Sequence, residues 1–160
     1  MSGEILSACR GMGAQIVGLQ EGDRWNAAEM ETRGFIPFVA DHGRAGVFVV
    51  SGLSSQIGES VIHDDIVGVV VGNVGCVSVY MPDSSKSLES LLGGILCLLE
   101  VCRFLTRHGA AVLNLMGDFQ VSLPSNVEGV AGDCRMSCTN VERQLALLDV
   151  RERFFLESMQ

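Results

Sequence analysis

Basic residues are scarce in this sequence, and their scarcity limits what the protein can bind. Eleven lysines and arginines stand against 19 aspartates and glutamates, which gives a net charge of −8 at pH 7. Proteins that bind nucleic acids draw much of their affinity from Lys and Arg side chains that neutralise phosphates. No basic stripe occurs along the chain. Electrostatics therefore opposes nucleic-acid binding, unless a metal ion held by carboxylates reverses the charge locally.

The sequence also lacks the features of a secreted, disulfide-bonded protein. Its first residues, Met-Ser-Gly-Glu, are not a secretory signal. Most of the six cysteines lie in apolar segments, where a free thiol behaves as a small hydrophobic group. Cys134 and Cys138 are spaced C-x-x-x-C, but no second pair or nearby histidine completes a zinc site. We therefore expect an intracellular, reduced protein, either nuclear or cytoplasmic.

No membrane span and no domain boundary is expected. The most apolar run, residues 91–105, contains Glu100 and Arg103 and is too short to cross a bilayer, so it predicts a buried helix. No repeat, linker or low-complexity stretch divides the chain. With 160 residues and 48% hydrophobic composition, the chain is long enough to form one core. We expect residues 1–160 to form a single domain.

Apolar runs bounded by Gly, Asn or charged residues predict the strands. They are expected at residues 14–20, 46–51, 66–71, 76–81 and 110–116. The segment Gly-Asn-Val-Gly at 72–75 predicts a hairpin between the third and fourth of them. Because a hairpin joins antiparallel strands, we expect a mixed sheet rather than a purely parallel one.

Helical periodicity alternates with these strands. A long amphipathic helix is expected over residues 88–105, with Asp83, Ser84 or Ser85 as N-cap and Gly109 as its end. Further helices are expected at 5–12 and 140–155, residues 25–34 are helical or irregular, and 117–135 are loop-rich. Alternating helices and strands indicate an α/β layered domain.

Three short motifs place a polar side chain at the end of an apolar strand. Glu21 ends IVGLQE and offers a carboxylate of the kind that Mg²⁺ prefers, although a solvated loop carboxylate is the plainer interpretation. Tyr80, the single tyrosine, ends VSVY beside Pro82, where it also fits a half-buried packing role. Asp118 ends LNLMGD and could accept a proton from water, or form an Asx-turn.

Taken together and in this order, the motifs resemble the endonuclease/exonuclease/phosphatase superfamily. LQE, YMPDS and a hydrophobic strand closing in GDFQ match the family's LQE, Y-x-P-N/D and GDFN, and HGRAGVFVVS resembles a further family strand. The match spans about residues 5–148. The resemblance implies an α/β fold of four layers, an α/β/β/α sandwich, here incomplete. The segment YMPDSS is also similar to the corresponding segment in the endonuclease domains of LINE-type retrotransposons.

The resemblance implies a role for each matching residue. Glu21 corresponds to the metal-binding Glu, with Mg²⁺ as the expected ion and Mn²⁺ as an alternative. Tyr80 corresponds to the Tyr that approaches the scissile phosphate, and Asp83 to the Asn or Asp after the Pro. Asp118 corresponds to the Asp that activates or positions the attacking water, and Gln120 stands where the family has Asn. Hydrolysis of a phosphodiester needs such charge neutralisation, water alignment and oxyanion donors.

The family pattern also extends beyond this sequence at both ends. An Asn on a first strand and a C-terminal Ser-Asp-His segment are without counterparts, so we expect a chain truncated at both ends. His42, His63 and His108 do not match the missing His and are expected at the surface or at a helix cap. Losing members of a catalytic unit lowers rates by orders of magnitude. We expect weak catalysis or none from this chain alone.

Two functions from different classes follow. The first is a Mg²⁺-dependent phosphodiester hydrolase of endonuclease type, acting on DNA more readily than RNA, with no membrane partner. The second is a non-catalytic remnant or binding domain that keeps the fold, such as a degenerate retrotransposon fragment. An unrelated α/β domain is a third reading. Because missing strands leave sheet edges uncovered, a partner chain that covers them is also expected.

Overall fold

The computed structural model describes residues 2–21, 25, 27–81, 88–119, 149 and 152. Its elements are α1 (Ser2–Gly11), β1 (Ile16–Gln20), α2 (Ala27–Thr32), β2 (Phe35–Val39), β3 (Ala45–Val50), a 3-10 helix η1 (Ser51–Gln56), β4 (Ile57–His63), β5 (Ile66–Val71), β6 (Val74–Tyr80), α3 (Leu88–Arg107) and β7 (Val112–Asp118). The chain divides into two compact units, the first comprising residues 1–80 and 100–117 and the second residues 81–99 and 118–160. The expected single domain stays a prediction.

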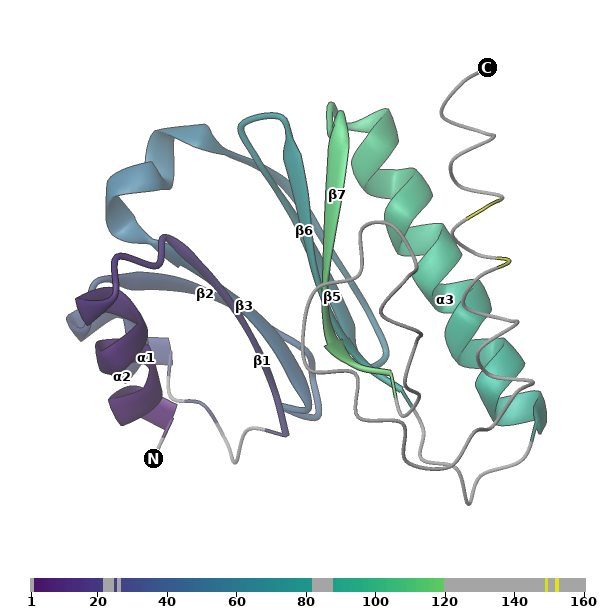
Figure 1. The fold of residues 1–160 in the computed structure, drawn as a ribbon, viewed down its shortest axis with the longest axis horizontal. Coiled ribbons are helices and arrows are strands. Elements are labelled where there is room, and N and C mark those ends of the chain that lie inside the picture. Colours follow the sequence, from purple (N-terminus) through teal and green to yellow (C-terminus); the bar gives the residue numbers. More distant parts are fainter. Residues whose placement is uncertain are drawn as a thin grey trace. The chain divides into compact units, whose positions relative to one another are not determined.

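The first unit is built on two sheets, which Figure 1 shows as separate layers. One has the strand order β1-β3-β2 and the other β4-β5-β6-β7. β1 and β2 both pair antiparallel with β3, and β5 pairs antiparallel with β4 and β6. The start of β7 lies beside the start of β6: the N–H of Ala111, just before β7, donates to the carbonyl of Asn73, just before β6, at 2.8 Å. At their other ends Gly117 lies against the carbonyl of Val79, so β6 and β7 run parallel and this sheet is mixed as expected.

Alternate residues of the central strands fill the space between the two sheets. From β3 these are Ala45, Val47 and Val49, and from β5 they are Val67, Val69 and Val71. Valine suits this interface because its branched side chain packs well on a pleated surface. All six residues of β5 are buried, as expected for a strand covered on both faces.

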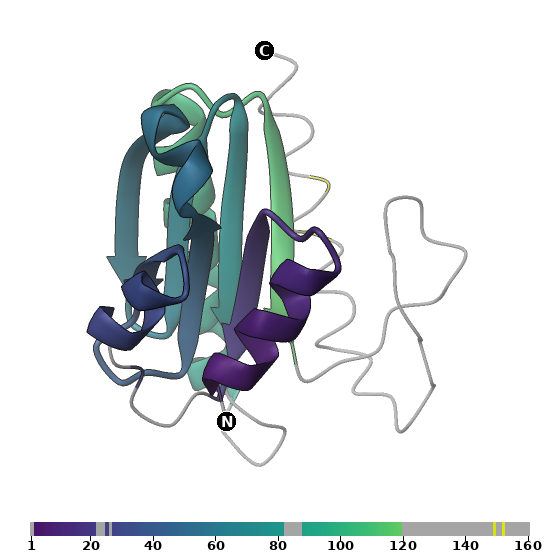
Figure 2. The ribbon, with the colours of Figure 1, turned by 90° about the vertical axis from the view of Figure 1, so that its left-hand side faces the viewer.

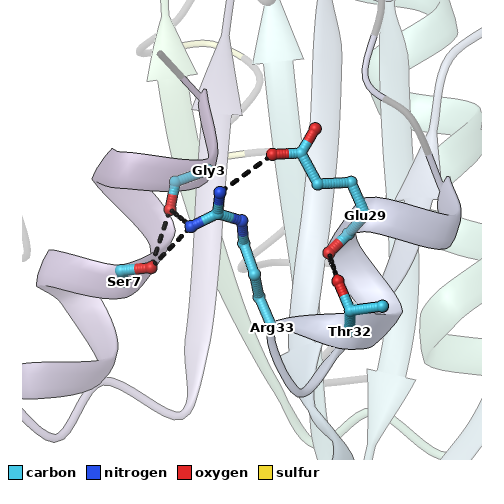
Figure 3. A network of polar contacts seen from close by, with 5 residues as sticks. All are labelled: Gly3, Ser7, Glu29, Thr32 and Arg33. Carbon is cyan, nitrogen blue, oxygen red and sulfur yellow. Dashed lines mark hydrogen bonds and ion pairs between the residues drawn. The ribbon is translucent and has the colours of Figure 1, made fainter.

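The outer face of the β1-β3-β2 sheet is covered by α1 and α2, as Figure 2 shows. Leu6, Met30, Phe35 and Phe48 are buried there, and the Trp25 ring packs edge-on against Phe48 with ring centroids 5.1 Å apart. The two helices are tied by Arg33, whose guanidinium donates to the carbonyl of Gly3, the hydroxyl of Ser7 and the carboxylate of Glu29, each at 2.9 Å (Figure 3).

The outer face of the second sheet is covered by the C-terminal part of α3, residues 100–107. A Cβ at Gly68 of β5 would lie within 2.9 Å of side-chain atoms of Val101 and Leu105, so this glycine lets the helix approach the sheet closely. The first unit thus has four layers in the order helix, sheet, sheet, helix. The expected α/β/β/α sandwich is confirmed.

Two strands were not expected from the sequence. β2, with the sequence FIPFV, contains a proline, which normally argues against a strand and is tolerated here at the edge of the sheet. β4, IGESVIH, is mostly exposed and lacks the long apolar run that marked the other strands. The remaining strands and the helices at α1, α2 and α3 agree with the predicted positions to within a few residues.

Some expectations fall outside the described residues. These are the N-caps at Asp83, Ser84 and Ser85, the loop at 120–135 and most of the helix at 140–155, of which Asp149 and Glu152 are described and helical. Among the described residues, no helix has the length and apolarity of a membrane span. Within the described part of the chain, β7 is the last strand of its sheet, and its Val112 and Leu115 are exposed. The expected partner chain stays a prediction.

Replacing Gly117 by alanine should destabilise the first unit. A Cβ there would lie 2.2 Å from the main-chain carbonyl oxygen of Val79, and backbone cannot move aside as a flexible side chain can. We expect a loss of about 1–3 kcal/mol in the free energy of unfolding, measured by urea denaturation. Gly11→Ala is the matched control, because nothing lies within 4 Å of its added Cβ. Equal stability of the two variants would contradict the close approach.

Stability should also fall at alkaline pH because of two buried thiols. Cys76 and Cys102 are free thiols. Burial raises the pKa of Cys76 above its ordinary value and the pKa of Cys102 to about 12. The unfolded thiols ionise first, so this contribution is complete below pH 9 and is lost as pH rises from about 9 towards 12.

The measurement is urea denaturation across that range, with Cys102→Ala beside the wild type. Each buried thiol contributes a slope of at most about 1.4 kcal/mol per pH unit, so the variant should lose stability less steeply. Parallel curves for the two proteins would mean that the Cys102 thiol does not resist ionisation in the folded chain.

Candidate functional site at one end of the first unit

Glu21 directly follows β1 and has an unusual backbone conformation. Its φ is 54°, in the left-handed region that residues other than glycine seldom occupy. Its N–H donates to the carbonyl of Arg44 at 2.9 Å, which continues the pairing of β1 with β3 by one residue. The side chain is exposed and makes no ion pair with any residue that the structure describes. The predicted metal ligand is therefore held by its backbone and has an accessible carboxylate.

Tyr80 is the last residue of β6 and is partly buried against the core between the sheets. Its N–H donates to the carbonyl of Asp65 at 3.1 Å, one step beyond the β5–β6 ladder. The guanidinium carbon of Arg44 lies 5.5 Å from the centre of its ring, within the range of a cation–π contact. Glu21 and Tyr80, which are 59 positions apart in the sequence, thus both adjoin Arg44.

A polar connection between the sheets supports this end of the unit. The side-chain amide of Gln20 donates to the hydroxyl of Ser78 at 3.0 Å, and that hydroxyl donates to the carbonyl of Leu19 at 3.1 Å. Ser78 is fully buried among the valines. Because a buried hydroxyl is costly unless it is hydrogen-bonded, the pair fixes how β1 and β6 align. In the LQE motif, Gln20 has this structural role.

Asp118 is the last residue of β7 and belongs to the second unit. Its carbonyl accepts a hydrogen bond from the N–H of Met81 at 2.9 Å, within the same unit. Gly117 before it has no room for a side chain, which explains the Gly-Asp pair at this strand end. The predicted role of the Asp118 carboxylate stays a prediction. Asp83 and Gln120 lie outside the described residues, so their predicted roles stay predictions as well.

None of the three histidines lies in the LQE, YMPDS or GDFQ motifs, and His42 begins the HGRAGVFVVS segment. His108 contacts the carbonyl of Phe104 through Nδ1 at 2.8 Å, near the end of α3, which agrees with the expected capping role. His63 lies 3.0 Å from the carboxylate of Glu100, and His42 is exposed between β2 and β3. Sequence reasoning assigned none of them to the site.

Two residues at this end were missed by the sequence-based prediction. Arg44 and Asp65 lie 3.9 Å apart, between the guanidinium Nη1 and the carboxylate Oδ2. Arg44 stands in the segment HGRAG, immediately before β3, and its position just outside a strand that pairs with the LQE strand was the signal available. Asp65 lies in the turn between β4 and β5, where a carboxylate suggests only a turn.

Comparison of the sequence with models of known protein families finds no match, and comparison with curated proteins finds none. Among solved structures, the chain is similar to a 3′ phosphatase, NExo, from Neisseria, solved bound to product DNA hairpin. The TM-score is 0.61 and the sequence identity 20%. The similarity covers 92% of this chain and 65% of the neighbour's, so the chain spans less than two thirds of that protein's length.

This similarity shows a shared fold. The shared fold is the one that the family resemblance implied. It does not bear on the likeness to LINE-type endonucleases. The chain therefore has the fold of a solved 3′ phosphatase.

Replacing Ser78 by alanine should weaken the attachment of β1 to β6. The amide of Gln20 would lose its closer acceptor and keep the carbonyl of Met116 at 3.5 Å, at a cost of about 1–3 kcal/mol in the free energy of unfolding. Urea denaturation measures the loss, and Ser60→Ala, at an exposed position of β4, is the matched control. If the two variants are equally stable, the hydroxyl of Ser78 does not join the sheets.

Proposed function

We propose that this chain is a divalent-metal-dependent phosphodiester hydrolase domain of endonuclease type, with Mg²⁺ as its ion. The observation that carries the proposal is the convergence of Glu21 and Tyr80 on Arg44 at one end of the first unit. The similarity in fold to a DNA 3′ phosphatase supports the same chemistry. In this proposal the site of hydrolysis is at the ends of β1 and β6.

The donor at Glu21 fits Mg²⁺. This ion prefers oxygen ligands, takes one or two carboxylates from the protein and keeps several waters. Glu21 offers an exposed carboxylate beside a strand end, held by a backbone conformation that costs on the order of 1–2 kcal/mol for a residue with a side chain. Such outliers concentrate at functional sites. Bound there, Mg²⁺ would neutralise phosphate charge and polarise the phosphorus–oxygen bond.

The other predicted residues act on the substrate phosphate and the attacking water. The Tyr80 hydroxyl donates a hydrogen bond to a non-bridging phosphate oxygen, where negative charge grows in the transition state. For Asp118, in the second unit, the proposal keeps the role that the resemblance implies, which is to activate or position the attacking water. For the other two residues the proposal keeps what the resemblance implies: Gln120 takes the place of the family's Asn, which orients the phosphate or the transition state, and Asp83 that of the Asn or Asp after the Pro.

The substrate class that we propose is nucleic acid, with DNA ahead of RNA, as the DNA hairpin of the structural neighbour suggests. The net charge of −8 makes an unassisted approach to a phosphate backbone unfavourable, so cations at the site, either the metal or an arginine, must offset it. A LINE-type origin and a partner chain along the exposed edge of β7 are finer parts of the same proposal.

Substituting Glu21 by glutamine should abolish the effect of Mg²⁺ on stability. A ligand that binds only the folded state raises the melting temperature, by about 3–6 °C when its concentration is about tenfold above Kd. We expect this rise in the wild type and in Glu59→Gln, a matched control on the exposed face of β4, and no rise in Glu21→Gln. Differential scanning fluorimetry with MgCl₂ against EDTA measures it.

Cleavage of supercoiled plasmid and of a labelled single-stranded oligonucleotide in Mg²⁺ or Mn²⁺ tests the chemistry. Wild-type cleavage that falls by at least about 100-fold in both Glu21→Gln and Asp118→Asn would support the hydrolase. No cleavage, or equal cleavage by all three proteins and hence contamination, would favour the non-catalytic remnant that keeps only the fold.

A further inference from the structure

Arg44 lies beside Glu21 and Tyr80, the two predicted site residues of the first unit. Its carbonyl accepts the hydrogen bond from Glu21, which fixes the backbone of the two residues against each other at 2.9 Å. Its guanidinium lies over the Tyr80 ring, 5.5 Å from the ring centre. One residue thus joins the end of β1 to the end of β6, and its positive charge lies next to the tyrosine.

The guanidinium is held loosely and faces solvent. Its carboxylate partner, Asp65, is 3.9 Å away, at the long limit of an ion pair, and 59% of the Arg44 side chain is exposed against 24% of Asp65. Exposed pairs of this kind contribute little to stability. A phosphate, in contrast, can bind a guanidinium through two parallel hydrogen bonds. Phosphate would therefore compete successfully with Asp65 for this side chain.

Asp65 itself is incompletely satisfied. Its second oxygen, Oδ1, is buried and has no hydrogen-bond partner among the residues that the structure describes. No donor offsets the negative charge on this oxygen, so the electrostatic potential near Arg44 is more negative. The guanidinium is attracted by that potential but is not tightly hydrogen-bonded to Asp65. Asp65 is thus suited to hold the arginine near the tyrosine in the absence of substrate, and to release it.

The other described arginines are engaged elsewhere. Arg33 and Arg10 bind groups on and between the helices α1 and α2, as Figure 3 shows for Arg33. Arg103 and Arg107 lie on α3. The chain has a net charge of −8, so a single positive charge at the candidate site changes the local electrostatic potential more than it would on a basic protein. Among the described residues, Arg44 is the cation in contact with Tyr80.

We propose that Arg44 is a substrate-binding residue that holds a phosphate group of a nucleic-acid strand beside Tyr80, with Asp65 as the internal counter-ion that the phosphate displaces. This rests on the proposed function for the substrate class. It adds a binding residue that neither the motifs nor the family pattern supplied. It also explains how an acidic chain can keep a phosphate at this end of the unit.

The test measures binding separately from hydrolysis. Anisotropy of a short fluorescein-labelled single-stranded oligodeoxynucleotide is titrated in EDTA, where metal-dependent cleavage cannot occur, from about 50 to about 200 mM NaCl. In Arg44→Gln we expect affinity to fall roughly tenfold and the slope of log K against log salt to shrink by about 0.7, the loss of one phosphate contact. Arg44→Lys should restore the slope and only part of the affinity, because an ammonium binds phosphate as a point charge.

Two further variants complete the test: Asp65→Asn removes the competing carboxylate, and Arg107→Gln is a charge-matched control. Removing the competing carboxylate should tighten binding at least about twofold, which is opposite to the effect of structural damage. Arg107→Gln removes the same charge as Arg44→Gln from α3 and should change affinity much less. Thermal unfolding of each variant verifies that it is folded.

The outcomes separate this proposal from the hydrolase proposal. Equal losses in Arg44→Gln and Arg107→Gln, weaker binding by a folded Asp65→Asn, or no binding by the wild type would each overturn the role of Arg44. Wild-type binding that depends on Arg44, together with no cleavage in Mg²⁺, would support Arg44 and count against hydrolysis. Metal-dependent cleavage that is unchanged in Arg44→Gln would retain the hydrolase and remove Arg44 from it.

Discussion

The packing of the two sheets against each other is the constraint on which the first unit depends. Val47 and Val49 on one sheet meet Val67 and Val69 on the other, all at 0% exposure, so neither sheet is sufficient without its partner. An apolar contact of this kind fixes the distance between the sheets but not their lateral alignment, because it has no direction. The hydrogen bonds that join Ser78 to Gln20 and to the carbonyl of Leu19 supply the missing direction.

That alignment is what brings the candidate site together. Glu21 follows Gln20, and Tyr80 is two residues beyond Ser78, so the same buried bonds that align the sheets set where β1 and β6 end. Functional side chains on rigid strand ends are positioned more precisely than side chains on long loops. The motifs LQE and VSVY therefore each contain a residue that holds the structure and a residue that faces the substrate in the proposed reaction.

The sequence predicted the parts of this fold whose environment is uniform. The strand at Ile66–Val71 is apolar throughout because it is covered on both sides, and the helix at Leu88–Arg107 has an unmistakable periodicity. β2 and β4 were missed because an edge strand need not have a continuous apolar pattern. β2 contains a proline, and β4 contains several polar residues. For the candidate site, motif order predicted Glu21 and Tyr80, which the structure places beside Arg44. Arg44 and Asp65 were out of reach, because their importance comes from a contact across 21 positions that no local pattern records.

The packing of the single tryptophan decides what a fluorescence experiment on this protein can see. Trp25 lies against Phe48 and over Gly46, on the side of the β1-β3-β2 sheet that α1 and α2 cover. Its emission is a local reporter of that outer layer. Circular dichroism, in contrast, averages over every helix and strand. If the two signals change at different denaturant concentrations, unfolding is not two-state, and the first unit loses its helical cover separately from the rest of the chain.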